Sequence, residues 1–372
     1  MIKLGDNTFG KIFKITSFGE SHGALVGVII DGAPAGLEFD LDIIQRELDK
    51  RRPGQSHLTT SRAELDKAEV LSGIFNNKTT GAPICLIVKN EDVNSSKYEV
   101  FKEMIRPSQV DYVLSQKFGG FADYRGSGRF SGRITAGFVM AGTLAKQILN
   151  KVNISVFAYT KSIGKIEDSQ NYYIKDINTF IEKREISPVR ALNPDLSKKM
   201  EHEIEVVQKA NDSIGGTISC IISNFPVGIG GPIFNSLESN ISKAIFSIPA
   251  IKGIEFGAGF KAAKMKGSEH NDSWTIKEGK IRTVKNDSGG IIGGISTGMP
   301  IKFTVAVKPT PSIGLAQKTV NIKTMKEEEI KIEGRHDPCI VPRAVVIVES
   351  MAAIVLLDYL LIEGKIPSVL KN

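Results

Sequence analysis

The chain has 372 residues, of which 41% are hydrophobic, and this length fits one large domain or two ordinary ones with a sizeable core. The formal net charge of +7 favours an anionic partner, which could be a nucleic acid, a membrane surface or a phosphorylated metabolite. Three cysteines without CxxC spacing exclude a disulfide framework and a zinc site, so we expect a reducing, cytoplasmic location.

The first segment of the chain predicts a turn followed by a strand. It contains no apolar stretch of signal-peptide length, so we expect no export. The motif GESHG places His22 between glycines in the turn that opens the strand. A lone histidine is usually structural or simply exposed, whereas a histidine in such a turn can also serve as a general acid or base.

An internal repeat favours the functional interpretation of His22. Residues 19–37 align without gaps to residues 211–229, with six of nineteen positions identical, and both predict a turn, a strand and a Pro-Gly turn. A chance match among many possible offsets is the alternative. If the repeat is real, two related halves meet in a shared core, each with sheet packed on helix. The counterpart of His22 is Ile214, so the scaffold itself does not need an imidazole there.

Each copy of the repeat is followed by a pattern typical of an amphipathic helix. The apolar residues are Leu41, Ile44 and Leu48 after the first copy and Leu237, Ile241 and Ile245 after the second. No strand-GxGxxG-helix unit is present, so a Rossmann fold is disfavoured.

A cationic cluster ends the first of these helices. The segment ELDKRRPGQSH contains Lys50, Arg51, Arg52 and His57. Cations at this position complement the helix dipole, which is a purely structural role. The planar fork of arginine is also suited to binding phosphate or carboxylate, and both interpretations stay open.

A second cluster alternates arginine with glycine between residues 106 and 133. Its members are Arg106, Arg125, Arg129 and Arg133. Glycine lets backbone N–H groups approach a ligand closely, while the arginines supply charge. Arginine-glycine segments also occur in RNA-binding tails. This segment continues directly into residues 135–150, which predict a buried helix, and a folded anion site is therefore favoured.

The remainder of the chain alternates polar segments with loop motifs. Residues 151–209 are polar and predicted to be peripheral, and residues 285–313 predict a Gly-rich turn, a strand and a Pro-interrupted loop. In the motifs KPTPS and GRHDP, Lys308, Ser312 and Arg335 are possible phosphate donors. Residues 344–362 approach the length of a membrane span, but they contain two carboxylates and therefore predict a buried helix.

Taken in order, the segments FGESHG, DKRRPG, RPSQVDY, GRFSGR, GGISTG, KPTPS and GRHDP resemble the motif series of the chorismate synthase family, over roughly residues 8–362. The resemblance implies an α+β fold, a β-α-β sandwich of two internally related halves with helices packed between the sheets. It implies a single domain over residues 1–372, with halves at approximately 8–150 and 205–362 and a more peripheral segment at 151–204.

The resemblance also implies the activity. Family members carry out an anti 1,4-elimination of phosphate from 5-enolpyruvylshikimate-3-phosphate, the last common step of aromatic amino-acid biosynthesis, and are carbon–oxygen lyases. The cofactor is FMN in its reduced form, and FAD and NADP are also associated with the activity. An external flavin reductase and a homotetramer are expected as partners, without nucleic acid, membrane or metal.

Site residues are implied by the same motifs. His22 matches the acid that protonates the departing phosphate, Asp337 the carboxylate that assists removal of the ring proton, and Gln109 a position beside the flavin. The substrate positions are Arg51, Arg52, His57, Arg106, Arg133 and Arg335. The FMN positions are Arg129, Phe130, Ser131, Pro249, Ala250, Gly293, Lys308, Pro309, Thr310, Pro311, Ser312 and Arg335.

The chain departs from the family pattern at several of these positions. Where relatives have histidine in the RPSQVD segment, this chain has Gln109, and His57 stands where relatives often have arginine. Phe130, Gly132 and Ile134 are further substitutions in the neighbouring segment. The changes indicate either a co-adapted site or a weakened one. The alternatives are an FMN-binding homologue whose catalysis has decayed and a basic nucleic-acid-binding protein.

Overall fold

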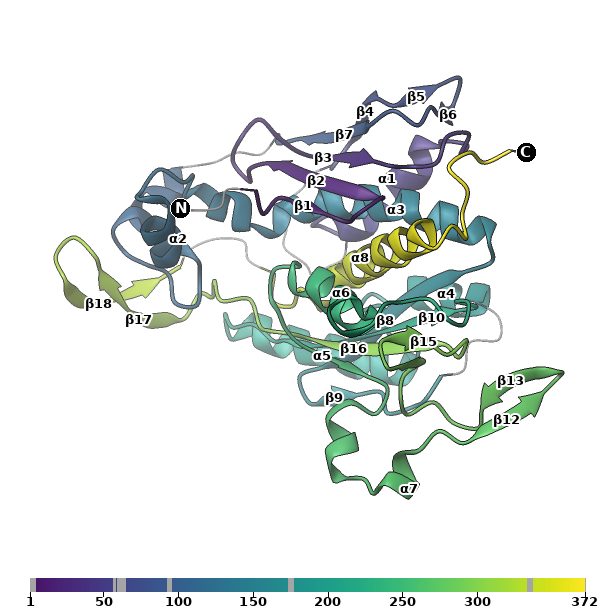
Figure 1. The fold of residues 1–372 in the computed structure, drawn as a ribbon. Helices are drawn as coiled ribbons and strands as arrows, with labels where there is room; N and C mark the ends of the chain where they lie inside the picture. The colour runs from purple at the N-terminus through teal and green to yellow at the C-terminus, as the bar shows by residue number, and fades with distance from the viewer. Residues whose placement is uncertain are drawn as a thin grey trace.

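The computed structural model describes residues 5–55, 58, 65–91, 96–172, 177–332 and 337–371. Within these residues, two antiparallel five-stranded sheets enclose a layer of helices (Figure 1). The first sheet has the order β1 (Thr8–Phe9), β2 (Lys14–Gly19), β3 (Leu25–Asp31), β7 (Ile84–Lys89) and β4 (Ala68–Ser72). The second has the order β11 (Ile251–Phe256), β16 (Ile301–Val307), β10 (Gly216–Ser223), β8 (Ser155–Ile163) and β9 (Ile166–Glu167).

The helices between the sheets form the centre of the molecule. They are α1 (Leu41–Arg51), α3 (Thr135–Lys151), α6 (Leu237–Phe246) and α8 (Val341–Ile362). Helices α3 and α8 pack against each other, α3 also contacts the first sheet, and α8 contacts strands β8 and β10 of the second. The predicted α+β sandwich with helices between the sheets is confirmed.

Side-chain alternation explains how each central strand faces the helices. In β3, Val26, Val28 and Ile30 are fully buried, while Ile29 on the opposite face is 39% exposed. Strand β10 buries Ile218 and Ile222 in the same way. Both repeat copies therefore form the strand that the sequence predicts, each in the middle of its sheet.

The two helical patterns that follow the repeat copies are also confirmed. Ile44 and Leu48 of α1 are fully buried, as are Leu237, Ile241 and Ile245 of α6. Helix α1 begins at an Asp40 side chain that accepts from the Asp42 N–H, and α6 begins at Ser236, which accepts from the Ser239 N–H. Residues 135–150 form the predicted buried helix, α3.

The two sheets correspond strand for strand. Strands β2, β3, β7 and β4 occupy the places that β8, β10, β16 and β11 occupy in the second sheet, and α1 and α3 occupy those of α6 and α8. The second half of this arrangement begins at β8, inside the segment 151–204. The prediction that this whole segment is peripheral is wrong, because β8 is an inner strand paired with both β10 and β9.

The polar composition of residues 151–209 comes from two inserted helices. Helices α4 (Ile177–Ile186) and α5 (Pro194–Lys209) are inserted between β9 and β10 and are largely exposed. A small apolar cluster that includes Phe157, Tyr159, Phe180 and Ile221 joins α4 to the face of the sheet opposite α8. The insertion therefore conceals the equivalence of β2 and β8 at the level of sequence.

Helix α8 is long and apolar enough to cross a membrane, but 89% of its most apolar window is buried inside the protein. The predicted buried helix is confirmed, and its two carboxylates have partners. Asp358 accepts hydrogen bonds from the backbone N–H groups of Lys11 (2.8 Å), Ile12 (2.7 Å) and Phe13 (2.9 Å). Glu349 pairs with Lys146 and Arg184.

Short elements project from this body. The hairpins are β5 (Ile74–Phe75) with β6 (Lys78–Thr79), β12 (Trp274–Lys277) with β13 (Lys280–Thr283), β14 (Ile291–Ile292) with β15 (Ile295–Ser296), and β17 (Ala316–Asn321) with β18 (Lys326–Lys331). The short helices are η1 (Ser96–Lys102), α2 (Asp111–Phe118), η2 (Arg125–Phe130), η3 (Gly132–Ile134), η4 (Ile233–Asn235), η5 (Gly259–Lys264) and α7 (Gly267–His270). Residues of η1, η2 and η3 line the site.

Candidate active site

A cavity of about 870 Å³ lies between the two halves of the molecule. Its walls come from the β2–β3 turn, the end of α1, η1 to η3, the segment after α6, the loop after β16 and the start of α8. Among the described residues that line it, one carboxylate, Asp337, faces six cations. The cations are Arg51, Arg106, Arg133, Lys252, Lys308 and Arg343.

One buried carboxylate holds two of these arginines. Asp66 accepts from Arg51 Nη1 at 2.7 Å and also pairs with Arg133 Nη1. Burial alone would raise the pKa of Asp66, but the two guanidinium groups lower it overall. Burial lowers the pKa of Arg51 to about 10, so this arginine is still charged at neutral pH.

Further contacts fix the direction of both side chains. Arg51 donates to Thr135 Oγ1 (3.1 Å) and to the Gly132 carbonyl (2.9 Å). Arg133 donates to Asn90 Oδ1 at 2.9 Å and to a backbone carbonyl of β7 at 3.1 Å. Both guanidinium groups are thus fixed at the cavity wall without a ligand.

Arg106, which also lines the cavity, is held in the same manner. Its guanidinium donates to both oxygens of Asp111, at 2.6 and 2.8 Å, and to Ser127 Oγ at 3.1 Å. It also lies 4.6 Å from the centre of the Phe101 ring, a cation–π distance. Such a bidentate pair orients a planar cation more firmly than a lysine could be oriented.

His22 lies in the turn between β2 and β3, 7% exposed, and lines the cavity. Its ring meets that of Tyr98 edge to face at 4.8 Å. A Cβ added to Gly126 would lie 2.5 Å from His22 Cδ2 and 2.8 Å from Nε2. Gly126 has a φ of +55°, so a residue without a side chain is required both for the backbone conformation and for the space that the imidazole occupies.

Gln109 lies beside the loop that follows β16. Its Nε2 donates to Ser312 Oγ at 3.1 Å, and the preceding carbonyl, of Ser108, accepts from Lys308 Nζ at 3.0 Å. Burial, with a smaller contribution from Lys252, lowers the pKa of Lys308. The segments RPSQVD and KPTPS, about 200 residues apart in sequence, therefore meet at one wall.

Most of the residues predicted to bind the cofactor line the same cavity. Phe130, Ser131, Pro249, Ala250, Lys308, Thr310, Pro311 and Ser312 all line the cavity. Thr310 Oγ1 is buried and has no hydrogen-bond partner among the described residues. Ala250 has a φ of +73°, an uncommon conformation for a residue with a side chain and one that often marks functional sites.

Asp337 lies at the N-terminal approach to α8. Its Oδ2 pairs with Arg343 Nη1, and Arg343 Nε donates to the Arg51 carbonyl at 2.8 Å. Arg343 thus links the carboxylate in the cavity to the end of α1.

Not every predicted site residue lines the cavity. Arg52 pairs with Asp49 at 3.3 Å, and Pro309 is exposed. Arg129 donates to the carbonyls of Gly19 (2.8 Å) and Ser17 (3.0 Å) at the end of β2. Gly293 lies in the turn between β14 and β15. His57 and Arg335 lie outside the described residues.

The sequence interpretation missed several residues of the site. Asp66, Asn90 and Tyr98 carry no local pattern that distinguishes them from other polar or aromatic residues. Asp111 and Arg343 had a weak signal, because each follows a predicted site residue by five or six positions, Arg106 and Asp337 respectively.

Among the described residues, the cavity is an anion-binding chamber lined by one imidazole, that of His22, and one carboxylate, that of Asp337. Three arginines are held by carboxylates or backbone carbonyls, so they can bind anionic groups without losing much side-chain entropy on binding. The lysines Lys252 and Lys308 add further positive charge. Such a chamber suits a ligand set with several phosphate or carboxylate groups.

A family model, curated relatives and a solved structure all match this chain to the same family. The family model described as chorismate synthase matches residues 13–361. A chorismate synthase from Dehalococcoides mccartyi is 52% identical, with 98% of this chain and 100% of the relative covered. One from Methanocaldococcus jannaschii is 49% identical, with 96% and 97% covered. A crystal structure of chorismate synthase superposes with a TM-score of 0.77 at 30% identity and covers 95% of this chain and 93% of that one.

Proposed function

Since the chain belongs to the chorismate synthase family, we propose that its cavity binds reduced FMN together with 5-enolpyruvylshikimate-3-phosphate. The enzyme is a carbon–oxygen lyase acting on phosphates, and its reaction is the 1,4-elimination of phosphate that yields chorismate. The placement of both ligands and the roles of individual residues are the proposal.

The single observation that carries the proposal is the positive charge of the cavity. Six cations face one carboxylate among its described lining residues, and when the paired carboxylates Asp66 and Asp111 are included the cations still exceed the carboxylates by three. The substrate carries one phosphate and two carboxylates, and FMN adds another phosphate and a ring anion when reduced, roughly seven negative charges together. An unpaired charge of this size would not be stable in a confined space, so the cations are a requirement for binding both ligands at once.

The residues on the Gln109 side of the cavity fit FMN. Thr310 Oγ1 is buried without a described partner and can donate to a ligand, as can the amine of Lys308 and the hydroxyl of Ser312. Phe130, Pro249 and Ala250 provide apolar contact for a planar ring. When bound, the reduced flavin supplies electron density and accepts the ring proton, a proton that an ordinary protein base could not remove.

The remaining roles belong to the chain itself. Arg51, Arg106 and Arg133 bind and orient the anionic groups of the substrate, since each is already held by a neighbouring acceptor. His22 donates a proton to the phosphate as it leaves. Asp337, held by Arg343, assists removal of the ring proton.

An anaerobic assay tests this function. The enzyme is mixed with chemically reduced FMN and substrate, and chorismate and inorganic phosphate are measured together. We expect equal amounts of both products, with no product when the FMN is oxidised. Binding of FMN without either product would instead support a homologue whose catalysis has decayed. This alternative is tested because Gln109 stands where relatives have histidine.

Other properties stay predictions. A cytoplasmic location, an external flavin reductase and a homotetramer follow from the family alone. Size-exclusion chromatography with light scattering tests the tetramer. Turnover with oxidised FMN and a reduced nicotinamide nucleotide, without added reductase, would contradict the need for an external reductase.

A further inference from the structure

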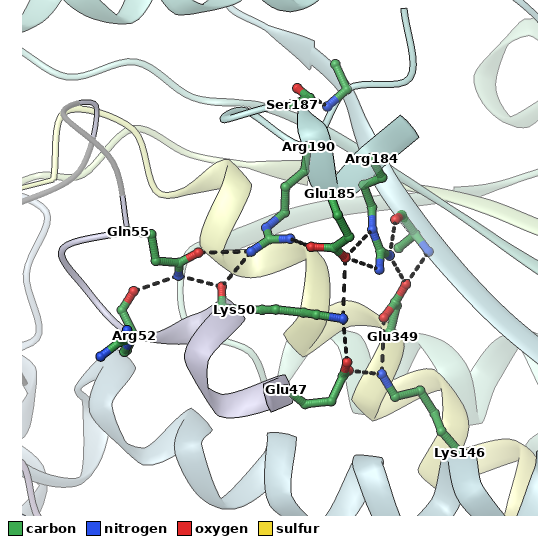
Figure 2. A network of polar contacts seen from close by, with 12 residues as sticks. Glu47, Lys50, Arg52, Gln55, Lys146, Arg184, Glu185, Ser187, Arg190 and Glu349 are labelled. Atoms are coloured by element: carbon green, nitrogen blue, oxygen red, sulfur yellow. Dashed lines mark hydrogen bonds and ion pairs between the residues drawn. The ribbon is translucent and has the colours of Figure 1, made fainter. Parts of the chain in front are cut away.

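The last turn of α1 is held by side chains from other parts of the chain. A helix ends with carbonyl groups that have no partner within the helix. Here the Lys50 carbonyl accepts from Arg190 Nη2 (3.3 Å) and Gln55 Nε2 (2.6 Å), and the Arg52 carbonyl accepts from Gln55 at 2.7 Å. Arg190 Nη2 also donates to Gln55 Oε1 at 2.9 Å. One guanidinium thus joins the helix end to the segment that follows it (Figure 2).

Arg190 belongs to the α4–α5 insertion, and its backbone is fixed to the second sheet. Its carbonyl accepts from the N–H of Thr160 in β8 at 3.0 Å, and its N–H donates to the Ser187 carbonyl at 2.9 Å. Arg190 has a φ of +59°, a left-handed conformation that costs a residue with a side chain about 1–2 kcal/mol. Its side chain is 9% exposed. The residue therefore connects the second sheet rigidly to α1 of the first half.

Glu185 completes the support. It accepts from Arg190 Nη1 at 2.8 Å and pairs with Lys50 at 3.3 Å and Arg184 at 2.7 Å. Burial alone would raise the pKa of Glu185, but Arg184, Arg190 and Lys50 lower it to about 2. The carboxylate is therefore charged throughout the physiological pH range, and Arg190 keeps this partner.

From Glu185 the ion pairs continue into the centre of the molecule. Arg184 pairs with Glu349 of α8, and Lys146 of α3 bridges Glu349 to Glu47 of α1 (Figure 2). The helix that carries Arg51 is thereby tied to the two central helices as well as to the insertion.

The corresponding helix of the second half provides an internal comparison. Helix α6 occupies the place of α1, yet its last turn is completed locally. The Ser247 hydroxyl donates to the Lys243 carbonyl at 2.9 Å, and its N–H donates to the Ala244 carbonyl at 3.2 Å. No arginine from another element holds these carbonyls among the described residues. The fold can therefore end this helix without such a clamp.

We propose that Arg190 is a positioning residue for substrate binding. Together with Gln55 it holds the end of α1, so that Arg51 and Pro53 keep their places at the cavity wall. The inference rests on the proposed function, in which Arg51 binds the substrate. It assigns a role in the reaction to the inserted α4–α5 segment, none of whose residues from 177 to 209 lines the cavity.

Two variants test the clamp with little risk to folding. Gln55→Ala removes an exposed side chain, and Arg190→Lys keeps the charge beside Glu185 but cannot contact the Lys50 carbonyl and Gln55 at once. We expect each to raise KM for the substrate about tenfold, the size expected for one lost hydrogen bond to a charged donor, with kcat within about twofold. The affinity for FMN, followed by quenching of flavin fluorescence, should not change.

The double variant and one control separate positioning from general destabilisation. Because both side chains act on one clamp, Gln55→Ala with Arg190→Lys should raise KM no more than the larger single effect. Arg184→Lys alters the same ion-pair network without touching the end of α1, so it should lower Tm while KM stays within twofold. Unchanged KM in the two single variants, or an equal rise in Arg184→Lys, would overturn the inference. Failure of the proposed function is distinguishable, because the unaltered enzyme would then show no turnover.

Discussion

The arginines of the cavity carry their charge in pairs with acidic partners. Asp66 forms ion pairs with Arg51 and Arg133, and Asp111 forms one with Arg106. Each of these three arginines is less than a tenth exposed. Without its carboxylate a buried guanidinium would be strongly unfavourable, and without the guanidinium the carboxylate would be. The site is therefore built before the ligands bind, and individual side chains in it have little freedom to adapt.

The fit between His22 and Gly126 yields a sharp prediction. Gly126→Ala places a methyl group against the imidazole and should displace it by part of an ångström. We expect kcat to fall about 10- to 100-fold, since misplacement on that scale costs up to about 10²-fold in rate.

His22→Ala should lower the rate by about 10²–10⁴-fold, as expected for loss of a general acid. Steady-state assays with reduced FMN measure both.

Gly364→Ala is the matched control for Gly126→Ala. Gly364 has a φ of +62°, similar to that of Gly126, but a Cβ there would meet nothing within 4 Å. The control should therefore share the loss of stability from backbone strain and retain full kcat. If both variants lose kcat equally, or His22→Ala retains full turnover, the role of His22 as the acid is wrong.

Gln109 offers a second prediction on a single residue. A histidine at this position could carry a charge and a proton to stabilise an anionic flavin, whereas glutamine offers only a neutral N–H donor. The difference between a charged and a neutral hydrogen bond is roughly 1–2 kcal/mol, which corresponds to about 5–30-fold in rate. We expect Gln109→His to raise turnover with reduced FMN about tenfold.

The hydrogen bond from Gln109 to Ser312 makes this result informative either way. An unchanged or lower rate with FMN still bound would show that the surrounding substitutions, Phe130, Gly132 and Ile134, have adapted the pocket to glutamine. Ser312→Ala is the companion variant, because it removes the partner of the amide but no charge.

At the scale of elements, α8 organises both halves. It contacts α1, α3 and α6 and two strands of the second sheet, and its two carboxylates reach outward to different segments. Glu349 forms ion pairs with Lys146 of α3 and Arg184 of α4, and Asp358 accepts hydrogen bonds from the segment before β2. Polar residues that look out of place in an apolar helix therefore connect it to its neighbours.

Asp358 gives a prediction about stability. Asp358→Ala leaves three backbone N–H groups, those of residues 11–13, without their acceptor; the bond from Phe13 is buried and the other two are partly buried. At about 1–3 kcal/mol for each unsatisfied group, partly relieved by water, we expect a loss of about 3–5 kcal/mol in the free energy of unfolding. Urea denaturation followed by circular dichroism measures it.

Asp358→Asn is the graded control. The amide keeps one acceptor oxygen, so the loss should be roughly half that of Asp358→Ala. A change below about 1 kcal/mol in the alanine variant would mean that the segment before β2 contributes little to stability.

At the scale of the whole molecule, the two halves share one topology but contribute different segments to the cavity wall. The His22 turn and α1 come from the first half, and the segment after α6, the loop after β16 and the start of α8 come from the second. In the turn that opens each central strand, the first half carries His22 and the second carries Ile214. The chemistry is thus divided between halves that share one topology.

The buried carboxylates predict how the stability of the molecule responds to acid. In Glu47, Asp66 and Glu185 burial would raise the pKa, but neighbouring cations lower it below its ordinary value, to about 2 for Glu185. A carboxylate with a lowered pKa in the folded state contributes stability above its unfolded pKa and loses it as pH falls. We expect Tm to fall steadily from about pH 4.5 towards pH 2.

Scanning calorimetry across this pH range measures whether Tm falls on acidification and whether the buried carboxylates cause the fall. Glu185→Gln should have a lower Tm at neutral pH and a shallower decline in acid, because this carboxylate no longer takes up a proton on unfolding. Glu278→Gln, on an exposed hairpin turn, should follow the unaltered protein. A Tm that rises on acidification to pH 3 would contradict the assignment.

Local sequence was sufficient for much of this protein. The helical spacing of Leu41, Ile44 and Leu48 predicted α1, and the apolar residues 344–362 predicted a buried helix. Motif order predicted the family and many of the residues that line the cavity. These features depend on periodicity or on short motifs, which involve residues close together in the chain and can therefore be recognised in the sequence.

Contacts in three dimensions were needed for the rest. Asp66 meets Arg133 across 67 residues, Asp358 meets Phe13 across 345, and Arg190 meets Lys50 across 140. No spacing rule relates such pairs, because each depends on how the sheets and helices pack. The inner position of β8 was hidden for the same reason, since the insertion of α4 and α5 separates it from its partner β10 in sequence but not in the sheet.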